Sequence, residues 1–210
     1  GPMALERALP LFGDALDALA TGHRLEVVHK DLKPSNLFVA HPGDRRERLV
    51  VLDFGIAGVQ DKARLTATGQ VLGTPQYLAP EYIRDQLVSP TIDVYQMGLI
   101  LVEMLTGRPV VNERNAMRCM MIHSKGLLEI PDALRTGPLG AVLDQALALD
   151  DTRRFPDAEA FSEAIHSVAM EVCGPLVSGQ FPARVPRTGS GNLRRPTTGE
   201  LSADDMDDAS

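Results

Sequence analysis

Residues 29–36 read His-Lys-Asp-Leu-Lys-Pro-Ser-Asn, and Asp53 follows two apolar runs further along the chain. The types of these residues suit phosphoryl transfer, which needs a carboxylate to orient a hydroxyl, oxygen ligands for Mg²⁺ and a cation near the moving group. The side chains that could supply these groups are Asp31, Lys33, Asn36 and Asp53.

A helix and two strands are expected to position these side chains. Apolar residues spaced by three and four over residues 4–21 predict a helix, in which Pro10 should produce a kink or delay the start. The apolar runs 37–40 and 49–54 flank a charged, turn-forming stretch, which predicts a β-hairpin with a long loop. The four polar side chains would then converge at one end of a small sheet.

The rest of the chain predicts a mostly helical α+β fold. Residues 55–90 are rich in Gly, Thr, Pro and Gln without a sustained period, and so long a connection predicts a functional loop. Residues 91–106 are apolar on nearly all sides, which predicts a buried central helix that ends at Gly107. Three more helices are expected near residues 112–124, 138–149 and 156–172.

Composition excludes several classes of protein. The 210 residues are 44% hydrophobic and have a net charge of −7, so a real core is expected and a nucleic-acid partner is not. The two cysteines lack metal-ligand or disulfide spacing, which favours a reducing, cytoplasmic compartment. This chain has no apolar run long enough to cross a membrane, although an anchor outside it is compatible with the sequence.

The last residues, 174–210, differ in composition from the rest. They are rich in Gly, Pro, Ser and Thr, with basic residues before acidic ones. Such a stretch cannot bury enough apolar surface to offset its ordering entropy, so we expect a disordered tail or linker.

Three motifs in order resemble those of the protein kinases. Residues 29–36 match H-R-D-L-x-x-x-N with one departure at Lys30, residues 53–55 are D-F-G, and residues 79–81 are A-P-E. The residues in and around these motifs are most similar to those of bacterial (Hanks-type) serine/threonine kinases. The resemblance implies a protein-kinase-like fold, with residues 1–173 forming the C-terminal lobe of a catalytic domain.

The resemblance also implies a role for each residue of the motifs. Asp31 would accept the proton of a substrate hydroxyl, and Lys33 would neutralise charge on the phosphoryl group of ATP. Asn36 and Asp53 would hold the Mg²⁺ ions that bridge the nucleotide phosphates. Thr74, in the substrate-docking segment 73–81, would hydrogen-bond to Asp31 and Lys33. Protein serine and threonine hydroxyls are the implied substrates.

Other residues resemble the scaffold of these enzymes. The Asp93 carboxylate is expected to accept backbone N–H bonds from the catalytic loop, and Glu81 and Arg154 are expected to form a buried ion pair. His29 is interpreted as a packed imidazole rather than an acid or base.

The segment between Asp53 and Glu81 is often phosphorylated in the family. Thr66 and Thr68 lie there, and both a phosphorylation site and ordinary loop threonines fit the sequence. Lys30 replaces an arginine that pairs with such a phosphate in many kinases. Because lysine offers no bidentate fork, control by phosphorylation is expected to be weaker here.

The N-terminal lobe of a kinase has no counterpart in this sequence. A Gly-rich loop, a strand lysine and its partner glutamate are absent, so we expect a fragment of a longer kinase, which by itself would be nearly inactive. An alternative is a lobe-only binding or regulatory module without catalysis. A kinase-fold enzyme for small molecules fits less well, because those relatives lack the docking segment. Homodimers could form through the missing lobe.

Overall fold

The computed structural model describes residues 1–54 and 74–174. The predictions made for Gly55, Gly73, Thr66, Thr68 and the tail 175–210 therefore concern residues outside the described part of the chain. Within that part, no helix combines the length and the apolar character that spanning a membrane requires.

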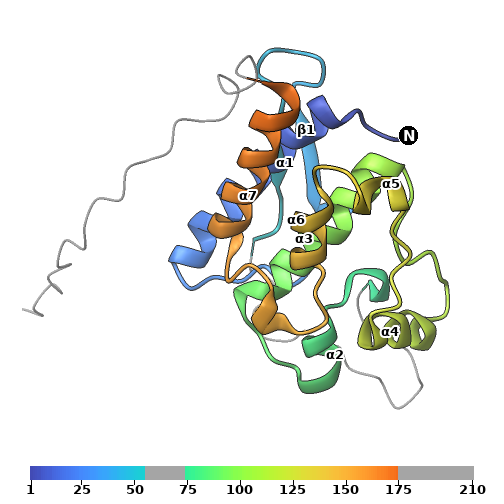
Figure 1. Cartoon of the computed structure of the whole chain (residues 1–210). Helices are drawn as coiled ribbons and strands as arrows, with labels where there is room; N and C mark the ends of the chain where they lie inside the picture. Colours follow the sequence, from blue (N-terminus) through green and yellow to red (C-terminus); the bar gives the residue numbers. More distant parts are fainter. Residues whose placement is uncertain (55–73, 175–210) are drawn as a thin grey trace, which may run out of the picture.

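Helix α3 (Pro90–Thr106) lies at the centre of the fold (Figure 1). Every residue from Ile92 to Val102 is buried, because other elements cover the helix on all sides. A helix in such a position needs apolar residues around its whole circumference, which explains the absence of a polar stripe. The prediction of a buried central helix is confirmed, and Gly107 caps its end in the left-handed region, with φ of 73°.

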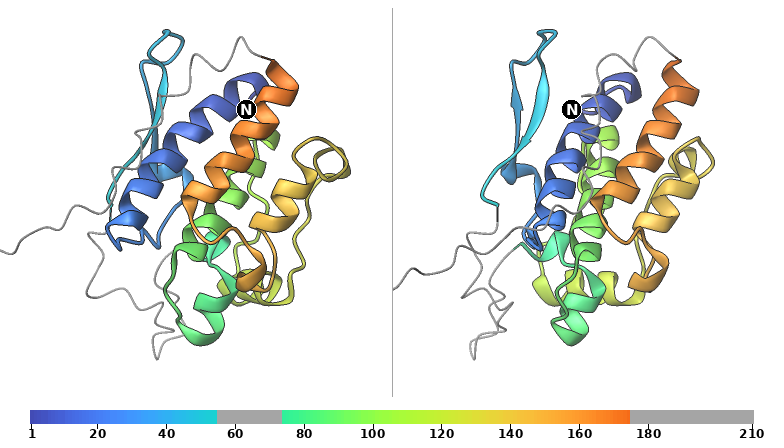
Figure 2. Two further views of the ribbon diagram at one scale, coloured as in Figure 1. Left: turned by 60° about the vertical axis from the view of Figure 1, so that its left-hand side comes forward. Right: turned by 90° about the vertical axis from the view of Figure 1, so that its left-hand side faces the viewer.

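Helices α1 (Leu5–Arg24) and α7 (Ala158–Cys173) lie side by side against α3 (Figure 2). Phe161 joins them: its ring meets that of Phe12 edge-on at 5.5 Å and stacks on that of Phe155 at 5.0 Å. Helix α1 begins at Leu5, so of the two effects expected of Pro10, a kink or a delayed start, the delayed start does not occur. The helix loses one backbone hydrogen bond at Pro10, and the burial of its apolar face offsets that loss.

The predicted β-hairpin is present. Strands β1 (Leu37–Ala40) and β2 (Arg48–Val51) pair antiparallel and lie beside α1 (Figure 2). One face of the hairpin buries Leu49 against the helix, whereas three apolar side chains on or beside the hairpin are exposed. These are Phe38, Val50 and Leu52, which are 58%, 37% and 40% exposed.

The remaining elements are short. They are η1 (Pro34–Asn36), η2 (Pro75–Tyr77), α2 (Pro80–Asp85), α4 (Ala116–Lys125), α5 (Asp132–Arg135), α6 (Gly140–Ala146) and η3 (Asp151–Arg153). Helix α2 falls within residues 55–90, where the sequence predicted only a loop. Its six residues are fewer than two turns, so no helical period could be read there.

A buried ion pair ties α2 to the segment before α7. The Arg154 guanidinium donates to both carboxylate oxygens of Glu81, at 2.7 and 2.9 Å, and both side chains are fully enclosed. Arg154 also donates to the carbonyls of Ala148 and Thr91 and lies 4.6 Å from the centre of the Tyr95 ring. The expected Glu81–Arg154 pair is thus confirmed, and its charges are compensated on every side.

Replacing Arg154 by methionine should lower the free energy of unfolding by about 3–5 kcal/mol, because Glu81 would remain buried without a partner. The neighbouring Arg153 is exposed, so Arg153→Met should cost about 0.5 kcal/mol or less. Chemical denaturation of the two variants checks this, and equal losses would contradict it.

Gly107 is also the point where the start of the chain meets α3. The Met3 amide donates to the Met104 carbonyl at 2.8 Å. A Cβ added to Gly107 would lie 2.7 Å from the Pro2 nitrogen, which is closer than such atoms approach. Gly43, with φ of 78°, has the same left-handed backbone but nothing within 4 Å of an added Cβ.

Alanine at either glycine should cost about 1 kcal/mol for the left-handed backbone. Gly107→Ala should cost at least about 1 kcal/mol more than Gly43→Ala, because only at Gly107 must the first residues of the chain move aside. Thermal unfolding of both variants measures the difference, and indistinguishable midpoints would show that the N-terminal contact does not contribute.

Candidate active site

The register of the hairpin brings Asn36 and Asp53 to one end of the sheet. Leu37 pairs with Val51, and the Leu52 amide continues the ladder by donating to the Asn36 carbonyl at 2.8 Å. Asn36 therefore lies opposite the residue that precedes Asp53. Two residues 17 positions apart in sequence reach the same place because the intervening strands fold back on each other.

Asp31 lies beside this end of the hairpin. The Asn36 side-chain amide donates to the Asp31 carbonyl at 2.7 Å, and the Lys33 ammonium donates to the Asp31 carboxylate at 2.7 Å. The Asp31 side chain is 47% exposed, so this ion pair adds little stability, but it orients the carboxylate. Its other oxygen, Oδ1, accepts no hydrogen bond from the described residues.

The loop that holds Asp31 is fastened to α3 by Asp93. The fully buried carboxylate of Asp93 accepts the backbone N–H groups of His29 and Lys30, each at 2.8 Å. This confirms the role expected of Asp93. A carboxylate removed from water needs such donors, so the loop and the charge stabilise each other.

His23 is a third partner of Asp93 that the sequence analysis missed. Its Nε2 donates to the Asp93 carboxylate at 2.9 Å, while its Nδ1 accepts the Ala158 amide at 3.1 Å. The signal was present: Leu16 and Leu19 belong to the apolar stripe of α1, and the same spacing of three and four continues to His23.

Phe54 packs on His29, the first residue of the catalytic loop. His29 is only 2% exposed, donates from Nε2 to the Leu52 carbonyl at 2.8 Å, and meets the Phe54 ring edge-on at 5.4 Å. The expectation of a packed imidazole is confirmed. A Cβ added to Gly22 would lie 2.6 Å from the Phe54 ring, so α1 needs a glycine there for Phe54 to keep this position.

Two residues of the site have a backbone that non-glycine residues rarely adopt. Lys30 has φ of 69° and Asp53 has φ of 57°. Left-handed conformations cost energy and persist where surrounding contacts enforce them, commonly at functional sites. For Lys30 the enforcing contact is the bond from its amide to Asp93.

The segment that begins at Thr74 is bound to α3 and α4. The Tyr77 hydroxyl donates to the Glu103 carboxylate at 2.5 Å, and burial, together with this bond, raises the pKa of Tyr77 well above its usual value of 10. The Gln76 side chain donates to the Glu113 carbonyl at 3.1 Å, and the Gln76 carbonyl accepts from Nε2 of His123 at 3.0 Å.

Thr74 itself is not joined to the other candidate residues. In the part of the chain that the structure describes, no hydrogen bond links Thr74 to Asp31 or Lys33, so the expected contact is not formed. Thr74 is the first described residue after position 54, and the described residues anchor the segment only from Gln76 onward. Its role stays a prediction.

The oxygen groups at this end of the hairpin suit Mg²⁺. The Asn36 side-chain nitrogen is bonded to Asp31, which leaves its amide oxygen, Oδ1, as the atom available to a cation. Asp53 is exposed and directly follows Leu52, whose amide is bonded to the Asn36 carbonyl. Mg²⁺ prefers oxygen ligands and keeps several waters, so one amide oxygen and one carboxylate are a sufficient protein contribution.

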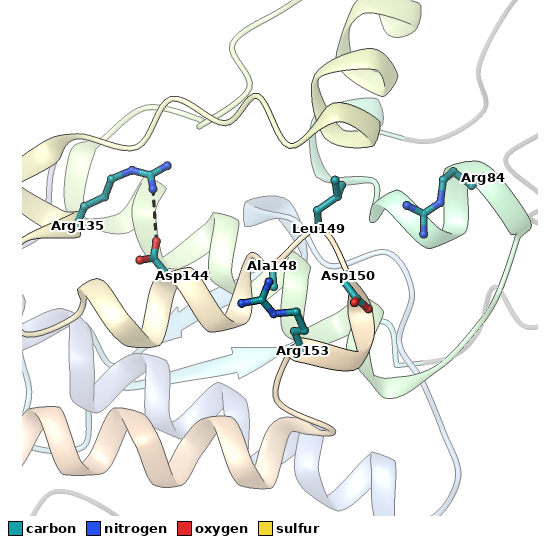
Figure 3. A pocket seen from close by; sticks show the side chains of 7 residues that line it. All are labelled: Arg84, Arg135, Asp144, Ala148, Leu149, Asp150 and Arg153. Carbon is teal, nitrogen blue, oxygen red and sulfur yellow. Dashed lines mark hydrogen bonds and ion pairs between the residues drawn. The ribbon is translucent and has the colours of Figure 1, made fainter.

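A hollow of about 740 Å³ lies elsewhere, among α2, α5, α6 and η3 (Figure 3). Three arginines and two aspartates line it, and Arg135 pairs with Asp144 across 3.4 Å. None of the predicted catalytic residues lines this hollow, so it is separate from the candidate site at the end of the hairpin.

Comparison with known proteins identifies the class that this fold and site define. Residues 3–169 match the protein kinase domain family, and the chain belongs to that family. The chain is similar to the serine/threonine-protein kinase PknB of Mycobacterium tuberculosis, 31% identical over 99% of this chain and 34% of that protein. It is also similar to the serine/threonine-protein kinase PrkC of Bacillus subtilis, with 33% identity over 76% of this chain and 24% of that protein. A third relative is the serine/threonine-protein kinase PkaA of Streptomyces coelicolor, with 34% identity over 80% of this chain and 31% of that protein.

These relatives are all named as bacterial serine/threonine kinases, as the motifs indicated. The chain spans about a third of the length of the curated relatives it matches. ATP and Mg²⁺ use and protein substrates are typical of the family.

His123, the partner of Gln76, should make stability depend on pH. Burial lowers the pKa of His123 from 6.5 to about 4, so the folded protein keeps it neutral where the unfolded chain protonates it. The unfolded state therefore binds more protons between about pH 6.5 and pH 4. The free energy of unfolding should fall by up to about 3 kcal/mol as the pH drops through this window, and the full stability is present above it.

Denaturation of the wild type and of His123→Gln between pH 4 and pH 7.5 measures this contribution. Glutamine can accept from Tyr95 and donate to Gln76, as His123 does, but it does not titrate. The difference between the two pH profiles should be confined to this window, and parallel profiles would contradict the assignment.

Proposed function

We propose that this chain is the C-terminal lobe of a serine/threonine protein kinase, which transfers the γ-phosphoryl group of ATP to protein hydroxyls. The observation that supports this most directly is the convergence of Asp31, Lys33, Asn36 and Asp53 at one end of the hairpin, in a chain of the protein kinase domain family. Residues 1–173 would form this lobe.

Each of the four side chains has a defined task in the proposed reaction. The carboxylate of Asp31 would accept the proton of the substrate hydroxyl as the new oxygen–phosphorus bond forms. Lys33, held 2.7 Å from Asp31, would offset developing negative charge. Mg²⁺ held by Asn36 and Asp53 would supply charge neutralisation on the nucleotide phosphates.

The exposed face of the hairpin indicates where the rest of the nucleotide site would lie. Phe38, Val50 and Leu52 form an apolar surface beside Asp53, and surfaces of this kind mark sites where a ligand or another protein unit binds. An aromatic base and an N-terminal lobe are the occupants that fit a kinase. Polar groups for the phosphates and apolar groups for the base are thus adjacent.

The segment from Thr74 to Glu81 would present the protein substrate. It is fastened at Gln76, Tyr77 and Glu81, so its backbone forms a firm platform next to the catalytic loop. Thr74, at the start of this segment, would contact Asp31 and Lys33 when substrate is bound.

Transfer of labelled γ-phosphate to a protein substrate tests the proposal. The chain is joined to the N-terminal lobe of the Bacillus subtilis relative and supplied with ATP and Mg²⁺. Asp31→Asn and Asp53→Asn should each lower the rate at least about 100-fold. Asp44→Asn, at the exposed far end of the hairpin, should leave the rate unchanged and serves as the matched control.

Because Asp31 is half exposed, Asp31→Asn should also leave the unfolding midpoint nearly unchanged. Wild-type rates in Asp31→Asn would refute the catalytic assignment. Absence of transfer by every version would favour the binding-module alternative, in which capture of a partner does not depend on Asp53.

A further inference from the structure

Gln96 is a polar residue in the middle of the most apolar helix of the fold. It lies between Tyr95 and Met97 on α3 and is only 2% exposed. A carboxamide removed from water is costly unless its donors and acceptors are bonded. The partners that compensate this cost show what the residue does.

The three partners that Gln96 has among the described residues are all backbone groups. Its Oε1 accepts the Leu32 amide at 3.0 Å, and its Nε2 donates to the Lys30 carbonyl at 3.0 Å and to the Tyr77 carbonyl at 3.2 Å. Because a backbone N–H can only donate and a carbonyl can only accept, these contacts fix which side-chain atom is oxygen and which is nitrogen. Both N–H donors of the carboxamide are used.

We propose that Gln96 is a positioning residue that holds the backbone on both sides of Asp31 and couples it to the segment after Thr74. Lys30 and Leu32 are the immediate neighbours of Asp31, so one carboxamide fixes the peptide groups before and after the candidate base. This inference rests on the proposed function only for the role of Asp31.

Gln96 complements Asp93 and does not duplicate it. The Asp93 carboxylate accepts N–H groups from residues before Asp31, those of His29 and Lys30. A carboxylate cannot donate, so it cannot hold a carbonyl. The side-chain amide of Gln96 donates to the Lys30 carbonyl and accepts from the Leu32 amide. Together with the bond from the Lys30 amide to Asp93, these contacts hold the strained backbone of Lys30.

The third contact extends the same support to the docking segment. Tyr77 is held to α3 twice, by its hydroxyl at Glu103 and by its carbonyl at Gln96. A shift of the segment at Tyr77 therefore acts on the amide nitrogen that also holds Lys30. This gives a direct physical link between the place where substrate would dock and the backbone of Asp31.

Residue-resolved amide exchange of the 210-residue chain, followed by NMR, tests the link without any need for kinase activity. The Leu32 amide is the reporter, because its acceptor is the Gln96 side chain. In Gln96→Met, which keeps the volume but removes the amide, Leu32 should exchange at least about tenfold faster. The His29 amide, bonded to Asp93, should change far less and is the internal control.

Coupling to the docking segment is tested by a double-mutant cycle. Tyr77→Phe removes the hydroxyl bond to Glu103 and should accelerate Leu32 exchange about threefold in the wild type but not in the Gln96→Met background. Met97→Leu, a buried change on the same helical turn without hydrogen bonds, should leave Leu32 exchange unaltered.

Unchanged Leu32 exchange in Gln96→Met, or an equal effect of Tyr77→Phe in both backgrounds, would overturn the proposal. If Gln96→Met does not fold, Tyr77→Phe alone decides: acceleration at Leu32 with no change at His29 supports the link, and no acceleration overturns it.

Kinetics of the chain joined to an N-terminal lobe give an independent readout. Gln96→Met should lower kcat about tenfold with KM for ATP unchanged, since the nucleotide contacts are not altered. Equal kcat in the two proteins would overturn the positioning role. If the wild-type fusion shows no transfer at all, the proposed function fails, and the exchange measurements still decide whether Gln96 links the two segments.

Discussion

The buried carboxylate of Asp93 is the interaction on which the arrangement of the site depends. A charge at a place with no exposed surface is stable only if fixed donors surround it. Those donors come from the catalytic loop, at His29 and Lys30, and from His23 on α1, which is itself bonded to the first residue of α7. The packing of three helices and the path of the catalytic loop are therefore set by the same charge.

The docking segment is fixed by a different principle. Between Gln76 and Glu81 it is bonded to α3, to α4 and to Arg154 before α7, through one ion pair, one hydrogen bond to the Glu103 carboxylate and further hydrogen bonds to neutral groups. These anchors belong to elements distant in sequence. Apart from η2 and the start of α2, the segment has no regular secondary structure, and its contacts with the helices beneath it fix its shape.

Much of the candidate site could be predicted from sequence because its residues form recognisable pairs of types. Glu81 with Arg154 and Asp31 with Lys33 are opposite charges at motif positions, and the structure brings both pairs into contact. The hairpin was predictable because two apolar runs flank a charged, turn-forming stretch. The buried helix α3 was predictable because a long run of residues is apolar on nearly all sides.

Gln96 and His123 could not be predicted in this way, whereas the backbone contacts of Asp93 were expected from the resemblance to a known motif. Gln96 and His123 bond to carbonyls of remote segments, and every residue has a carbonyl, so no partner type exists to search for. Helix α2 was missed because six residues are too few for a period.

The bare apolar face of the hairpin links occupancy of the site to the stability of the molecule. Covering Phe38, Val50 and Leu52 removes apolar surface from water and so lowers the free energy of the folded protein. The unfolded chain does not receive this stabilisation. Covering this face also holds β1 and β2 in register and hence Asn36 next to Asp53. By linkage, a body that covers the face and a cation bound by Asn36 and Asp53, as proposed, would promote each other's binding without touching each other.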